Sequence, residues 1–92
     1  MFRRKRHLCP CCGYLTLEDT SPGSHLICPI CFWEDDPLQF EEPDMEDGAN
    51  VVSLRQAQRN FGNFGCSEER FREHVRSPTK RDRRGVEWRP LE

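Results

Sequence analysis

Four cysteines stand in two pairs of one form, and thiols at this spacing bind metal ions. The segments 9–13 (Cys-Pro-Cys-Cys-Gly) and 28–31 (Cys-Pro-Ile-Cys) each place two sulfurs three positions apart in a tight turn, or knuckle. This C-x2-C…C-x2-C pattern is typical of a closed tetrathiolate site. Proline stiffens such a turn, and a glycine after the second cysteine accepts the positive φ that closes it. We therefore predict that one metal ion is held by Cys9, Cys12, Cys28 and Cys31.

The predicted metal is a single structural Zn2+. Thiolate tetrahedra also accept iron, which is the alternative. The two knuckles resemble locally those of rubredoxin, whose four cysteines hold one iron. The second knuckle has Phe32 where glycine is usual. Its exit must therefore differ from that of the first knuckle, or Phe32 must accept some strain.

Two thiols, Cys11 and Cys66, are left over. Cys11 could replace Cys12 as a ligand, face away as a small residue, or act as a reactive thiol. Cys66 is expected to be a buried small hydrophobic residue, with a redox role as the alternative. His7 and His25 flank the knuckles, but four correctly spaced cysteines make them unnecessary as ligands.

Size and composition favour a metal over disulfides. A chain of 92 residues with 35% hydrophobic residues builds a thin core, so one domain of this size needs a staple. The basic start is not followed by an apolar stretch, and no apolar run is long enough to span a membrane. We therefore expect a cytoplasmic protein with reduced thiols.

The pattern predicts a single small α+β domain over residues 1–92. Residues 7–33 are predicted to form a zinc-ribbon-like hairpin, with strands at 14–17 and 25–27 joined by a turn. Residues 34–50 form an acidic loop, pinned to the core by Trp33, Leu38 and Phe40. Two short helices follow at 51–65 and 67–77. The basic tail, 79–92, is docked on the core through Trp88.

Helix limits follow from capping residues. Ser53 and Gln56 fit a capping box at the start of the first helix, and Gly62 or Gly65 ends it. Ser67 is predicted to cap the second helix.

Charge is distributed unevenly, although the net charge is only −2. No Lys or Arg occurs from His7 to Leu54, whereas both ends of the chain are basic. Such asymmetry is typical of a face that meets a charged partner. The predicted partner-binding acids are Glu34, Asp35, Asp36, Glu41, Glu42, Asp44, Glu46 and Asp47.

Several segments together resemble the bacterial cysteine-rich CPCC family. They are the first knuckle, residues 28–36 (CPICFWEDD), residues 50–54 (NVVSL), Gly65-Cys66 and residues 75–78 (VRSP). The resemblance implies a small bacterial protein with a metal-binding N-terminal half, and it supplies no established activity. Small bacterial proteins of this sort are often found near toxin genes as immunity partners, which is an association and not a mechanism.

Three functions compete, and none is catalytic, because a zinc closed by four thiolates leaves no position for substrate. The favoured one is a non-enzymatic protein-interaction module, such as an immunity or adaptor protein, whose acidic loop binds a basic partner, for example a toxin. The second is nucleic-acid binding. The third is redox chemistry by iron or by Cys11 and Cys66. The basic face of the second hypothesis comprises Arg3, Arg4, Lys5, Arg6, Lys80, Arg81, Arg83 and Arg84.

Overall fold

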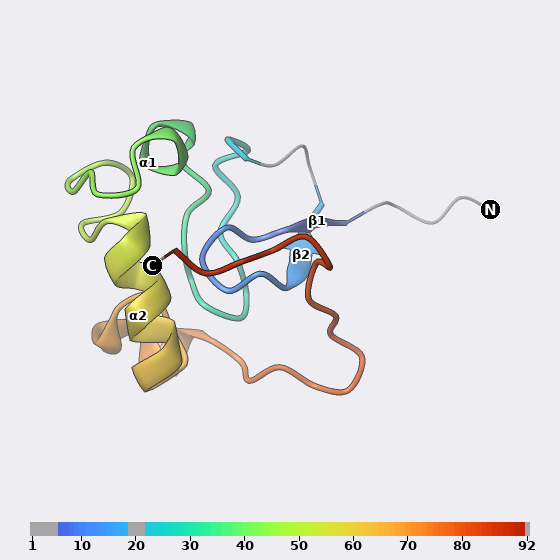
Figure 1. Cartoon of the computed structure of the whole chain (residues 1–92). Coiled ribbons are helices and arrows are strands. Elements are labelled where there is room, and N and C mark those ends of the chain that lie inside the picture. Colours follow the sequence, from blue (N-terminus) through green and yellow to red (C-terminus); the bar gives the residue numbers. More distant parts are fainter. Residues whose placement is uncertain (1–5, 19–21, 92) are drawn as a thin grey trace.

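The computed structural model describes residues 6–18 and 22–91. Its elements, in chain order, are β1 (His7–Leu8), β2 (Leu15–Leu17), α1 (Pro37–Glu41), α2 (Leu54–Phe64) and the 3-10 helix η1 (Glu69–His74) (Figure 1). A two-stranded hairpin, a few short helices and four clustered cysteines confirm the predicted fold class. No helix among the described residues is long and apolar enough to cross a membrane.

The hairpin encloses the first knuckle instead of joining the two knuckles. β1 pairs antiparallel with β2, with His7 opposite Leu17 and Leu8 opposite Leu15. The predicted pairing of residues 14–17 with 25–27 is wrong. Residues 25–27 instead turn back on 33–35, where Ile27 forms a bridge with Glu34. Each knuckle therefore has its own short pair of extended segments, because the chain reverses within the knuckle itself.

The segment predicted as an irregular acidic loop contains a helix. Asp36 caps α1 by accepting a hydrogen bond from the Leu38 amide at 2.8 Å, and Pro37 occupies the first helical turn. This Asp-Pro start is a standard helix signal. Leu38 and Phe40 were predicted to pin the segment, but they are 61% and 40% exposed.

The longer helix, α2, is capped at both ends by predicted residues. The Ser53 hydroxyl accepts from the Gln56 amide at 3.1 Å, and Gly65 ends the helix at φ 79°. The second helix is shorter than predicted and is a 3-10 helix. Ser67 does not cap it, because the residue at the N-cap is Glu68, which makes no side-chain capping hydrogen bond. The Ser67 amide instead donates to the Cys31 carbonyl at 2.7 Å.

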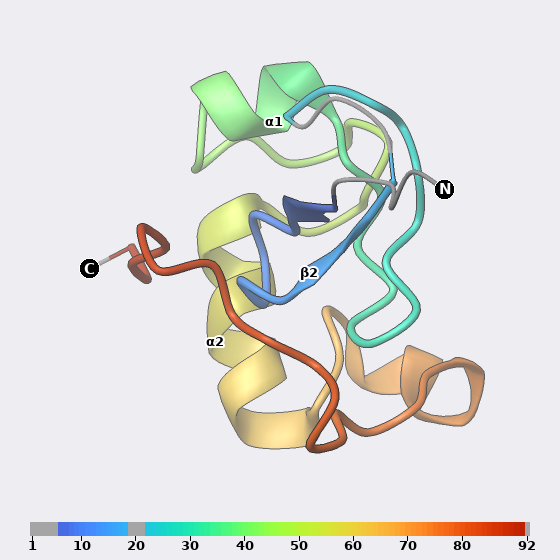
Figure 2. The same ribbon diagram turned by 90° about the vertical axis from the view of Figure 1, so that its right-hand side faces the viewer.

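The core lies around the two knuckles and the inner face of α2. Besides the cysteines it contains Leu17, Ile30, Trp33, Leu54 and Ala57. The C-terminal segment runs beside the hairpin (Figures 1 and 2), where Arg84 forms a bridge with Tyr14. The Trp88 indole packs on the first knuckle, as the predicted docked tail requires.

Candidate metal centre

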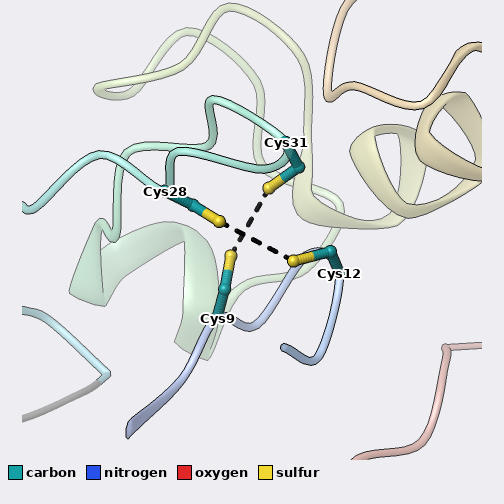
Figure 3. A group of neighbouring side chains, drawn as sticks. All are labelled: Cys9, Cys12, Cys28 and Cys31. Carbon is teal, nitrogen blue, oxygen red and sulfur yellow. Dashed lines mark hydrogen bonds between the residues drawn. The ribbon is translucent and has the colours of Figure 1, made fainter. Parts of the chain in front are cut away.

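Four buried sulfurs converge on one point (Figure 3). The sulfurs of Cys9 and Cys31 are 3.5 Å apart, those of Cys12 and Cys28 are 3.7 Å apart, and all four lie within 4.8 Å of one another. Ligands at about 2.3 Å around a tetrahedral zinc stand about 3.8 Å apart, whereas a disulfide requires about 2 Å. The four sulfurs are therefore positioned to hold a metal ion.

Both knuckles use the same hydrogen bonds. In the first, the Gly13 amide donates to the Cys9 carbonyl at 2.7 Å. In the second, the Phe32 amide donates to the Cys28 carbonyl at 2.8 Å. A second bond in each, from Cys9 to the Tyr14 carbonyl and from Cys28 to the Trp33 carbonyl, closes the turn. The sulfurs of each pair are thus fixed by equivalent backbone turns.

Phe32 takes the conformation of the missing glycine. Its φ is 69°, against 80° at Gly13. A left-handed backbone costs a residue with a side chain about 1–2 kcal/mol. The Phe32 ring lies 4.7 Å from that of Phe71 and stacks on His74 at 5.4 Å. This packing against η1 offsets the strain that the sequence indicated at Phe32.

Three side-chain donors, from α2 and from the C-terminal segment, cover carbonyls of the first knuckle. The Gln58 amide of α2 and the Trp88 indole N–H both donate to the Pro10 carbonyl, at 2.9 Å and 3.0 Å. Arg84 Nε donates to the Cys12 carbonyl at 3.0 Å. The first knuckle is therefore held from outside by α2 and by the C-terminal segment.

Hydrogen bonds to sulfur favour the charged form of Cys28. The Thr16 hydroxyl lies 3.1 Å from Cys28 Sγ, and the Ile30 amide donates to it at 3.4 Å. Contacts from the sulfurs of Cys12, Cys31 and Cys9 lower the pKa of Cys28 most, and the Thr16 hydroxyl lowers it further. Burial raises the pKa of Cys9 and Cys31. Without a cation the four sulfurs share protons, and a bound cation would replace those protons.

The two additional thiols are buried and poorly suited to redox chemistry. Cys11 and Cys66 are both buried, and desolvation raises the pKa of each. The Cys66 thiol donates to the Glu68 carbonyl at 3.0 Å. His7 and His25 are not in the sulfur cluster. His25 instead faces Glu34 at 3.4 Å.

The predicted acidic contact surface loses three of its members, Glu34, Asp35 and Asp36. Asp35 and Asp36 are buried, because their carboxylates are needed as acceptors inside the fold. Asp35 Oδ2 accepts from the Gly23 and Ser24 amides at 2.9 Å and 3.0 Å. Glu34 is half-buried. The remaining exposed acids, which we call the acidic surface, are Glu41, Glu42, Asp44, Glu46 and Asp47.

The predicted basic face is only partly assembled. Arg6, Arg83 and Arg84 border one groove, so the structure brings the two basic ends of the chain together there. Lys80 and Arg81 do not line this groove, and Arg3, Arg4 and Lys5 lie outside the described residues. Arg84 is used internally, since its guanidinium lies 4.8 Å above the Tyr14 ring and 5.0 Å from that of Trp88.

Sequence reasoning missed Gln39, the buried polar residue that organises the acidic segment. Gln39 Nε2 donates to the carbonyls of Met45, Asn50 and Val52 at 3.0–3.1 Å. Its Oε1 accepts from the backbone and the side chain of Asn50. A glutamine on a short helix carries no local signal of such a role. The Asp-Pro pair before it, however, could have located the helix.

Comparison with known protein families agrees with this geometry. The model of the family described as "Cysteine-rich CPCC" matches residues 7–82, which include both knuckles, α1, α2 and η1. The chain therefore belongs to the cysteine-rich CPCC family. A search of curated proteins found no match.

Proposed function

We propose that this protein is a non-enzymatic module, stapled by one structural Zn2+, that binds a basic partner protein through its acidic surface. The observation that carries the metal assignment is the closed tetrathiolate geometry. All four cysteines are fully buried, so four thiolates would complete the coordination of zinc and leave no position for a substrate. The metal would contribute folding free energy and no chemistry of its own.

The metal assignment is tested by metal content and chelation. We expect the purified protein to carry one zinc per chain by elemental analysis. Removing zinc with a chelator should abolish the fold, seen as loss of dispersed amide resonances. Cys9→Ser should behave like the chelated protein, whereas Cys66→Ala should keep full zinc. Iron in place of zinc would contradict the assignment, and so would a folded metal-free protein.

The charge of α1 and the loop after it supports a basic partner. Five exposed acids occur within seven residues, in a segment that holds no Lys or Arg. Asp44 is paired with Arg55 Nε at 2.6 Å, and the other four form no ion pair with any residue that the structure describes. The uncompensated charges would steer a basic protein toward this side of the molecule and raise its association rate.

Charge reversal tests this surface without disturbing the fold. We expect Glu41→Lys/Glu42→Lys/Glu46→Lys to lose the proteins that co-purify with the wild type at moderate salt and to keep its zinc. Asp47 is left in place, because its φ of 57° tolerates lysine poorly. Glu73→Lys, an exposed acid on η1, is the control and should retain the partners. Equal retention by the triple variant would refute the acidic surface as the contact.

A further inference from the structure

A groove of about 620 Å³ lies between the hairpin and the C-terminal segment. Aliphatic side chains, which we call its floor, make up much of the lining: Leu8, Pro10, Leu15 and Val86. Phe40 of α1 also contributes to the lining. Pockets in the range of about 300–1,000 Å³ are large enough to bury several side chains or a small ligand.

Two features of the lining are not explained by the fold. Val86 is 89% exposed, the most exposed large hydrophobic side chain described. The Arg83 side chain makes no hydrogen bond or ion pair to any described residue, although its carbonyl accepts from Leu15 at 2.8 Å. Backbone pairing therefore fixes the position of Arg83, and its guanidinium stays available at the groove.

The charge at the groove is opposite to that of the acidic surface. Among the described residues that line it, three are arginines (Arg6, Arg83 and Arg84) and one is an acid, Glu87. Arg6 has a partner, Glu18, at 3.3 Å, but both side chains are about half exposed, and such a pair contributes little stability. Its guanidinium can therefore exchange Glu18 for a carboxylate from outside.

We propose that this groove binds an acidic polypeptide segment, whose apolar side chains enter the floor and whose carboxylates meet Arg6 and Arg83. An apolar floor with a cationic rim is complementary to a segment that alternates acidic and apolar residues. A nucleic acid fits less well. The aliphatic floor does not offer the successive aromatic surfaces on which bases stack, since the aromatic rings among the described lining residues are those of Phe40 and His7. The groove is thus a second interaction site, independent of the acidic surface.

The test selects the ligand without assuming its sequence. A phage library that displays random nine-residue peptides is first passed over the zinc-loaded Arg83→Glu/Val86→Asp variant, which removes peptides that bind outside the groove. The remaining phage are then selected for binding to the zinc-loaded wild type. We expect the enriched peptides to combine acidic with large apolar residues. Absence of enrichment, or enrichment of basic peptides, would overturn the proposal. So would displacement of the selected peptides by single-stranded DNA at equal charge concentration.

A matched pair of variants then locates the site. In fluorescence anisotropy, Arg83→Glu should weaken the best selected peptide at least tenfold, whereas Arg81→Glu, an exposed arginine outside the groove, should change its affinity less than twofold. Equal losses would show non-specific charge attraction and overturn the groove as the site. The Glu41→Lys/Glu42→Lys/Glu46→Lys variant should retain the peptide, which separates this proposal from the acidic-surface function.

Discussion

Single residues at the knuckle exits decide whether the two cysteine pairs can face each other. Gly13 and Phe32 occupy the same place in equivalent turns, and both have positive φ. Gly13 has a second constraint, because the Trp88 ring occupies the space of its missing Cβ. Phe32 instead uses its ring to join the second knuckle to η1 through Phe71. Position 13 therefore has no room for a side chain, whereas position 32 uses a large aromatic side chain for packing.

Gly13→Ala should destabilise the protein more than any ordinary Gly→Ala change. A Cβ at this position would lie only 2.4 Å from the Trp88 ring, and the φ of 80° disfavours alanine. Strain of about 1–2 kcal/mol and loss of Trp88 packing together should cost at least about 2 kcal/mol in thermal or urea unfolding.

The control is Gly62→Ala, a helix-interior position with nothing within 4 Å of the added Cβ. It should stabilise α2 by about 0.5–1 kcal/mol. If both variants shift stability in the same direction, Trp88 does not pack on the knuckle as described.

In the acidic segment, the residue that matters most for stability is Gln39. Gln39→Leu removes five hydrogen bonds. The carbonyls of Met45 and Val52 lose the Gln39 donor, and the Asn50 carbonyl keeps the Gly48 amide. Each buried polar group left unpaired costs about 1–3 kcal/mol, so we expect a loss of at least about 3 kcal/mol in urea unfolding. Gln56→Leu, on the exposed side of α2, should stay within about 0.5 kcal/mol of the wild type.

At the scale of elements, local patterns were predictable from the sequence and long-range pairings were not. The cysteine spacing located both knuckles, and Ser53 and Gly65 fixed the ends of α2, because these signals act within a few residues. Residues 25–27 pair with the segment that follows the second knuckle, because the chain reverses its direction in that knuckle. No local sequence pattern predicts this pairing. From the sequence, Asp35 and Asp36 are predicted to be surface charges. In the fold both are buried, because their carboxylates accept hydrogen bonds from backbone amides of other segments.

The C-terminal segment acts as a strap over the first knuckle, and most of it lies beyond the residues matched by the family model. Its contacts include the Trp88 indole and Arg84 Nε, which bond to the Pro10 and Cys12 carbonyls. Gly85 adds a backbone bond to the Gly13 carbonyl at 2.7 Å. The strap therefore binds the turn that carries two of the four ligands.

Loss of the strap should loosen the metal before it unfolds the chain. We expect Trp88→Ala to lower stability by about 1–3 kcal/mol and to speed zinc transfer to a colorimetric chelator severalfold. Val86→Ala, a change at an exposed site of the same segment, should alter neither measurement. Unchanged zinc transfer in Trp88→Ala would mean that the strap does not support the knuckle.

On the scale of the whole molecule, the sulfur cluster takes the place of a large apolar core. The described residues bury few large side chains besides Trp33, Leu17 and Ile30, and they surround the cysteines. The hairpin, α2, η1 and the strap all contact the knuckles. Stability of the molecule as a whole should therefore follow occupancy of the metal site.

Because folding depends on zinc binding, the direction in which zinc affinity changes with pH can be predicted. In the unfolded, zinc-free chain a thiol titrates at about pH 8.5, and in the fold burial raises the pKa of Cys9 and Cys31. In either state these sulfurs carry protons at neutral pH until a cation displaces them. Zinc binding should therefore release protons, and its affinity should rise with pH up to the thiol pKa and fall steadily as pH drops below it. Titration calorimetry in two buffers of different ionisation enthalpy measures the released protons directly. Cys66→Ala should release the same number, because Cys66 is not in the cluster. A zinc-binding enthalpy that is the same in both buffers would show that binding releases no protons. The sulfurs would then already be ionised, and this prediction would be wrong.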